Sequence, residues 1–101
     1  MPYKIEITDL VFDELRTIAV FHRRRIIEEI NVQLTHQPTN ATRNRKLLSA
    51  AVPAFEHAAP IWELRVGEFR VFYDVNEASG IVYIRAVRRK GQGQTTEDLL
   101  Q

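Results

Sequence analysis

The chain contains no cysteine and only four glycines and four prolines among its 101 residues. Without cysteine it can form neither a disulfide framework nor a thiolate metal site. The spacing of its histidines, His22, His36 and His57, matches no metal-binding motif, and we expect no metal or other cofactor. The sequence also lacks a run of about 20 apolar residues, the length that a membrane-spanning helix needs, and its start lacks the apolar block of a signal peptide. We therefore expect a soluble cytoplasmic protein.

The net positive charge of the chain is small, but the basic residues are unevenly distributed along it. The formal net charge is only +1, which taken alone does not favour a nucleic-acid partner. However, residues 31–60 contain several basic side chains and a single acid, and residues 78–96 contain four basic side chains and no acid. The placement of basic residues is more informative than their sum. About 45% of the chain is hydrophobic, which suffices for one core, so we expect a single domain over residues 1–101.

Apolar periodicity predicts the order of the elements. Residues 3–9 alternate between apolar and polar side chains, as a strand does. Residues Asp9–His36 have helical spacing but are too long for one helix in so small a domain, so we predict a helical hairpin with a break near Val20–Arg23. The apolar stripe of its first half takes Leu10, Phe12, Leu15, Ile18 and Ala19. Three strands follow, at Ile61–Val66, Phe69–Val75 and Ile81–Val87.

Two segments are less defined. Within residues 41–60, Lys46–Leu48 forms either a short strand or a turn of helix, and Pro53 and Pro60 prevent a long element. The tail ends in "TTEDLLQ", which suits one helical turn. The whole order predicts an α+β fold, with an N-terminal strand and a two-helix hairpin packed on one face of a small, mainly antiparallel sheet whose other face stays open.

The first two strands of the meander predict a register. If Gly67-Glu68 is a two-residue loop, Arg65 lies opposite Arg70 and Glu63 lies opposite Phe72. One face of the hairpin is then apolar and faces the helices; it carries Trp62, Leu64, Val66, Phe69, Val71 and Tyr73. Extending the alternation to the third strand adds Val82, Ile84 and Ala86 to that core face.

The opposite face gathers charge and aromatic rings. It carries a row of arginines, Arg65, Arg70 and Arg85, with Glu63, Phe72 and Tyr83 beside it. Like charges on adjacent strands repel each other, whereas guanidinium groups bind a phosphate bidentately. Phe72 and Tyr83 offer planes on which bases could stack. The pattern is typical of an RNA-contacting surface; the alternative is a solvated face whose acids balance its bases.

The segment Trp62–Tyr73, "WELRVGEFRVFY", followed by Ile81–Val87 and the basic Arg88–Lys90, resembles the toxins of the RelE/ParE superfamily of bacterial toxin–antitoxin modules. Residues Arg45–Leu47 resemble the short basic segment before the meander of that family, and the resemblance covers nearly the whole chain. It implies the RelE/ParE-like fold and an acidic antitoxin that neutralises the toxin. For the RelE branch it implies an endoribonuclease that cuts messenger RNA on the ribosome and inhibits translation.

The resemblance also implies roles for residues. Arg70 matches the arginine that stabilises charge at the scissile phosphate, and Arg65 and Lys90 match neighbouring basic positions. Glu63 stands where some members have a lysine, and it is the candidate general base of a metal-independent ribonuclease. These four residues form the expected catalytic set. The expected RNA-binding set is Arg45, Lys46, Phe72, Tyr83, Arg85 and Arg89.

Two other activities stay open at this point. The ParE branch implies inhibition of DNA gyrase without a nuclease site, and a catalytically inactive homologue would act only as a protein-binding module. The tail after Lys90 lacks the aromatic or histidine residue that often follows the basic segment in the nuclease branch, which favours these alternatives.

Overall fold

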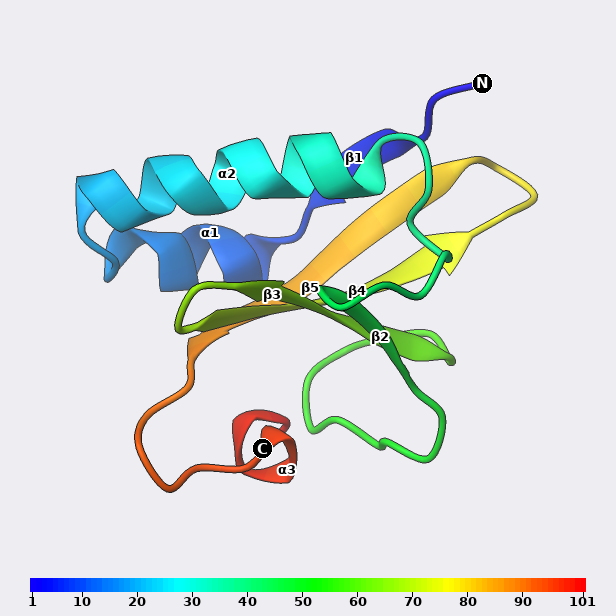
Figure 1. Cartoon of the computed structure of the whole chain (residues 1–101). Coiled ribbons are helices and arrows are strands. Elements are labelled where there is room, and N and C mark those ends of the chain that lie inside the picture. The colour runs from blue at the N-terminus through cyan, green and yellow to red at the C-terminus, as the bar shows by residue number, and fades with distance from the viewer.

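The structure, a computed structural model, describes residues 1–101 as one five-stranded sheet with helices on both faces (Figure 1). The elements are β1 (Lys4–Ile7), α1 (Asp9–Arg16), α2 (Val20–Leu34), β2 (Arg45–Leu48), β3 (Ile61–Val66), β4 (Phe69–Asn76), β5 (Ile81–Arg89) and α3 (Thr96–Leu99). The strand order is β1-β5-β4-β3-β2, with β1 parallel to β5 and the other pairs antiparallel. The expected α+β class and the three-strand meander β3–β5 are confirmed.

The helices form the expected hairpin, but the break lies at Thr17–Ala19 rather than near Val20–Arg23. Thr17 ends α1, because its backbone N–H and its hydroxyl both donate to the carbonyl oxygen of Glu14, at 3.1 and 2.7 Å. A threonine side chain that competes for backbone hydrogen bonds in this way is a local helix terminator. The apolar spacing that continues through Ile18 obscures this signal in the sequence.

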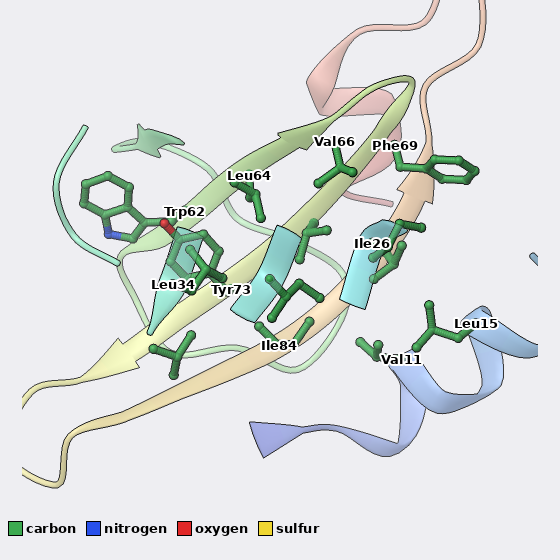
Figure 2. Close-up of a cluster of buried hydrophobic side chains, with 14 residues drawn as sticks. Val11, Leu15, Ile26, Leu34, Trp62, Leu64, Val66, Phe69, Tyr73 and Ile84 are labelled. Carbon is green, nitrogen blue, oxygen red and sulfur yellow. The ribbon is translucent and has the colours of Figure 1, made fainter. Parts of the chain in front are cut away.

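The main core lies between the helical hairpin and one face of the sheet (Figure 2). From α1 the core takes Val11 and Leu15, whereas Leu10 and Phe12, which we expected in the apolar stripe, are 39% and 53% exposed. From α2 it takes Ile26, Ile30 and Leu34. From the hairpin it takes the expected Trp62, Leu64, Val66, Phe69, Val71 and Tyr73. Each such aliphatic or aromatic side chain contributes about 1.5–3 kcal/mol by leaving water.

Tyr73 ties the segment after α2 to this core. Its ring stacks on Trp62 with the ring centroids 6.3 Å apart, and its hydroxyl donates a hydrogen bond to the carbonyl oxygen of Pro38 at 2.5 Å. The side chain is fully buried, and this burial raises the pKa of its phenol well above the ordinary value. A buried tyrosine commonly finds such a partner for its hydroxyl.

The register of the β3–β4 hairpin is the expected one, with Arg65 paired to Arg70 and Glu63 paired to Phe72. The next pair of strands departs from simple alternation, because the pairing of β4 with β5 shifts between Phe72 and Tyr73. An irregularity of this kind moves every later side chain to the other face. Ala86 therefore joins the face opposite the helices rather than the core.

We expected the face opposite the helical hairpin to be open to solvent. It is instead largely covered. Residues 49–60 and α3 pack on it (Figure 1) and form a second cluster around Phe72. Phe55, Leu99 and Leu100 lie over Phe72, which is fully buried. The two segments whose structure the sequence left least defined thus supply the cover.

Both segments take regular structure in part. Residues Arg45–Leu48 form β2, which pairs with β3 at the sheet edge, so the strand alternative was the correct one. The tail forms the short helix α3, whose start is closed by a capping box between Thr95 and Asp98. Such reciprocal hydrogen bonds satisfy backbone donors that would otherwise have no partner. No helix has the length and apolar character needed to cross a membrane.

Candidate functional site

A row of arginines crosses three strands on the face opposite the helices. Arg65 on β3 pairs with Arg70 on β4, and Arg70 pairs with Arg88 on β5. We expected Arg85 to be the arginine of β5 in this row, and this was wrong. The register shift between Phe72 and Tyr73 places Arg88 opposite Arg70 instead. Arg88 forms an ion pair with Glu14 and donates to the carbonyl oxygen of Leu99 at 3.0 Å.

Arg70 is the central and most buried member of the row. Only 7% of it is exposed, and its Nη1 donates to the carbonyl oxygens of Gly67 and Phe69, both at 2.9 Å. Burial lowers the pKa of Arg70, the neighbouring positive charge of Arg65 lowers it further, and Glu63 acts in the opposite sense. The guanidinium is therefore held in a fixed position, where an incoming anion would relieve its electrostatic cost.

Glu63 is a carboxylate surrounded by this positive charge. It lies on β3 between Lys46 of β2 and Phe72 of β4. Only 8% of it is exposed, and its Oε2 accepts a hydrogen bond from the hydroxyl of Thr96 at 3.1 Å. Thr96 begins α3, so the terminal helix is in contact with the candidate base. A nearly buried carboxylate beside cations suits either proton transfer or a purely structural charge balance.

Three further cations at this site have no anionic partner. Lys46 and Arg65 are exposed and Lys90 is half-buried. The ion pairs of the structure involve none of them and do not involve Arg70. Lys46, Arg65 and Arg70 share a face of the sheet with Glu63, and Lys90 follows the end of β5, where its backbone N–H donates to the carbonyl oxygen of Glu68. The nearby carboxylates of Glu14 and Glu68 are paired with Arg88 and Arg89. The cations without an ion pair therefore give this face an excess of positive charge, which is the electrostatic character of a phosphate-binding surface.

Other expected RNA contacts are engaged elsewhere. The Nε of Arg85 donates to Asp74 at 2.7 Å and its Nη1 approaches Glu56 at 3.3 Å. Its guanidinium also lies over the ring of Tyr83, 4.7 Å from the ring centroid. Tyr83 pairs with Asp74, beyond Phe72 along β4. Arg85 and Tyr83 therefore belong to a charge cluster around the buried Asp74 that anchors residues 56–58, at a distance along the sheet from the arginine row.

Two members of the expected RNA-binding set are inaccessible. Phe72 is fully buried beneath Phe55 and α3, so its ring offers no free plane for a base. Arg45 is 7% exposed, and it donates to the carbonyl oxygens of Asn40 and Gln33, at 2.9 and 2.7 Å. Both residues support the fold, and the expectation that Phe72 lies on an open face was wrong.

Arg89 is exposed but paired. Its Nε and Nη2 each donate to the carboxylate of Glu68 at 2.9 Å, and this hydrogen bonding lowers the pKa of Glu68. Because both groups are exposed, the pair is screened by solvent and can open for another anion. Sequence reasoning missed Thr96 and Glu14 as neighbours of the site. The only feature of the sequence that indicates a helix beginning at Thr96 is the capping pattern of Thr95 and Asp98.

The chain is similar in fold to solved structures of RelE proteins. The structure is similar to the archaeal RelE–RelB complex from Pyrococcus horikoshii OT3, with a TM-score of 0.70 and 21% identity over 92% of this chain and 100% of that chain. It is also similar to the toxin–antitoxin complex RelBE2 from Mycobacterium tuberculosis, with a TM-score of 0.65 and 20% identity over 89% of this chain and 100% of that one. The free RelE toxin of E. coli, in a mutant form, has a TM-score of 0.53 and 14% identity over 93% and 88%. The chain thus has the fold of these RelE proteins.

A family model extends the likeness from fold to family. The model described as the ParE toxin of the type II toxin–antitoxin system parDE matches residues 5–93. The chain belongs to this toxin family, within the RelE/ParE superfamily, and is the toxin of a type II toxin–antitoxin system. No curated protein gives a significant match.

Proposed function

We propose that this toxin arrests translation by cutting messenger RNA, as a metal-independent endoribonuclease of the RelE type. The observation that carries the proposal is a set of cations without ion pairs: Lys46, Arg65 and Arg70 share a sheet face with the carboxylate of Glu63, and Lys90 follows the end of β5. Unpaired cations on one face favour a polyanionic ligand, and a carboxylate among them is the group that a ribonuclease needs to activate a hydroxyl.

In the proposed mechanism, Glu63 accepts the proton of a ribose 2′-hydroxyl. The 2′-oxygen then attacks the adjacent phosphorus atom, and the bond from phosphorus to the 5′-oxygen of the next nucleotide breaks. That 5′-oxygen takes a proton from water, so the products are a 2′,3′-cyclic phosphate and a free 5′-hydroxyl. Arg70 and Arg65 stabilise the negative charge that grows on the phosphoryl oxygens, and fixed donors are most effective in this role. Because Glu63 is 8% exposed and in contact with Thr96 of α3, the mechanism includes a small movement of α3 that admits the ribose.

We propose an acidic antitoxin as the regulatory partner. Solved relatives of the same fold are described as RelE bound to RelB and as the complex RelBE2. An acidic segment laid over Arg65 and Lys46 would neutralise the charge that the RNA needs. The exposed Phe12, Val20 and Phe21 on the helical hairpin are apolar side chains that a partner of this kind would cover. The proposed substrate, messenger RNA on the ribosome, places the activity in the cytoplasm.

A second candidate function is inhibition of DNA gyrase by direct binding. The family model carries the ParE description, and Glu63 is 8% exposed, which suits a structural carboxylate as well as a general base. In this case the cations would contact an acidic surface of the target protein rather than RNA.

One experiment separates the two functions. The chain is expressed from an inducible promoter in bacteria, and pulse-labelled protein synthesis, DNA synthesis and message integrity are followed. We expect protein synthesis to fall first, with cut messages, and Arg70→Ala to abolish the effect. Intact messages together with a defect in DNA synthesis or supercoiling would replace the nuclease with the gyrase inhibitor.

A further inference from the structure

A polar cleft adjoins the candidate site, between α2 and the turn end of β3. Its volume is about 350 Å³. The residues that matter for its chemistry are Arg25, Glu29, Gln33, Asn44, Arg65 and Gly67. Arg65 is the only one of these that also belongs to the arginine row, so the cleft begins where that row reaches the edge of the sheet.

The two arginines of the cleft lack counter-ions. Arg25 and Arg65 are both exposed, and neither takes part in an ion pair of the structure. Arginines elsewhere on the sheet, such as Arg85 and Arg88, are paired with carboxylates. Two unpaired guanidinium groups that line one cleft present a rigid set of donors for a single oxyanion.

The one acid of the cleft is already engaged. Glu29 accepts a hydrogen bond from the side-chain amide of Gln33 at 3.3 Å. The amide oxygen of Gln33 accepts in turn from Nη1 of the buried Arg45 at 2.9 Å. This chain of hydrogen bonds couples the charge of Glu29 to that of Arg45. A hydrogen bond from a neutral amide leaves Glu29 charged, so the two arginines and one carboxylate give the cleft a net charge of +1, and neither Arg25 nor Arg65 forms an ion pair.

The position of Arg25 depends on the glycine of the hairpin turn. Its Nη1 lies 2.9 Å from the point that a Cβ atom on Gly67 would occupy. Gly67 also has a φ of +57°, which favours glycine for conformational reasons. The missing side chain lets the guanidinium lie against the turn, beside Arg65, so that both groups can reach one anion.

We propose that this cleft binds a phosphate group between Arg25 and Arg65, and that the phosphate belongs to a single-stranded RNA that crosses the hairpin turn. The side-chain amide of Asn44 forms no hydrogen bond within the chain and supplies a further donor. Because Arg65 belongs to both the cleft and the arginine row, a polymer with regularly spaced anions can occupy the two together. The RNA part of this proposal rests on the proposed function, whereas the phosphate site does not.

The first experiment titrates the protein with inorganic phosphate and follows the side-chain N–H signals of arginine and asparagine by NMR. We expect the signals of Arg25, Arg65 and Asn44 to shift together along one binding curve, and we expect Arg25→Gln to abolish the shifts of the other two. Unchanged Arg25 and Arg65 signals in the folded protein would overturn the site.

The second experiment measures the binding of a single-stranded 2′-O-methyl RNA, which cannot be cut through its 2′-oxygen. Arg25→Gln should weaken binding about tenfold, as expected when a charge-assisted contact to phosphate is lost. It should also reduce the slope of log K against log salt by about 0.7, the value for one phosphate of a single strand. The matched control is Arg24→Gln, which removes the same charge from a different surface of α2.

The remaining outcomes decide the identity of the ligand. Equal losses in Arg25→Gln and Arg24→Gln would mean a general effect of charge and would overturn the cleft. A loss of binding to polyglutamate, with RNA binding unchanged, would assign the cleft to an acidic protein and overturn the proposal. If the wild-type toxin fails to cut messages but Arg25 and Arg65 respond to phosphate, the proposed function fails while the phosphate site stands.

Discussion

Arg65 and Arg70 are directly paired across the β3–β4 hairpin, yet their surroundings are opposite. Arg65 is exposed to solvent, whereas Arg70 is 7% exposed and donates to two carbonyl oxygens of the turn. Like charges in adjacent strands are destabilising, and here the repulsion lowers the pKa of Arg70 in addition to the effect of burial. One arginine is therefore fixed by the fold, and the other is free to meet a ligand.

This difference predicts separate effects of substitution at the two positions. Arg65→Gln should change the free energy of unfolding by no more than about 0.5 kcal/mol, as is usual for an exposed side chain, and should still weaken toxicity. Arg70→Gln should lose its charged hydrogen bonds to the turn and cost about 1–3 kcal/mol, in addition to abolishing toxicity. Urea denaturation of the purified variants measures the free energy of unfolding, and growth after induction measures toxicity. Equal destabilisation by both substitutions would contradict the assignment.

Glu63 gives the sharpest test of the chemistry. Glu63→Gln keeps the size of the side chain and an oxygen that can accept from Thr96, but it removes the proposed base. We expect message cleavage to fall by about 10²–10⁴, the usual contribution of general base catalysis, while the melting temperature changes little. Thr96→Val is the control, because it removes the contact and keeps the carboxylate, so cleavage should persist. Full cleavage by Glu63→Gln would exclude the proposed role.

The sequence predicted the hairpin well because its register depends on local rules. A two-residue turn at Gly67-Glu68 and strict alternation determine which residues face the helices, and both features are readable in a short window. The same reasoning failed one strand later, where the shift between Phe72 and Tyr73 exchanged Arg85 for Arg88. A bulge of this kind depends on how distant segments pack, and no glycine or proline marks it in the sequence.

The cover over Phe72 was equally hidden. Phe55 and Leu99 are far apart in the sequence, and neither lies in a segment with strong periodicity. Their burial against Phe72 is a tertiary contact that local patterns do not encode. An exposed aromatic in an alternating strand therefore carries little functional information until the loops around the sheet are known. The exposure of Arg65 and Lys46 agrees with the general preference of charged side chains for the surface, whereas Arg45 and Arg70 are buried and donate to backbone carbonyl oxygens.

The charge cluster around Asp74 predicts a contrast between a buried and an exposed ion pair. Asp74 is 2% exposed and accepts from Arg85 and from the backbone N–H of Ala58. Asp74→Asn would remove the buried counter-ion of Arg85 and leave only its exposed partner Glu56, and it should cost about 3 kcal/mol. Glu56→Gln removes only the exposed partner of Arg85 and should cost less than about 1 kcal/mol. Chemical denaturation gives both values, and similar costs would contradict the model of an anchored loop.

Tyr73 predicts a loss of stability at alkaline pH. Burial raises the pKa of its phenol in the folded state, whereas the unfolded value is about 10. Below pH 10 both states keep the proton, so the contribution to stability is constant. As the pH rises above 10, the unfolded state releases its proton first, and the free energy of unfolding falls by about 1.4 kcal/mol per pH unit for one group until the folded-state pKa is reached.

Tyr73→Phe should therefore change the curve in two ways. At neutral pH it should cost about 1–2 kcal/mol, because the carbonyl oxygen of Pro38 loses its hydrogen bond. Above pH 10 its stability should fall less steeply than that of the wild type, so the two curves converge. Urea denaturation at intervals from pH 8 to about pH 11 measures this. Tyr83→Phe, which removes a phenol that donates no hydrogen bond within the chain, is the matched control, and parallel curves for Tyr73→Phe and the wild type would show that another group governs alkaline unfolding.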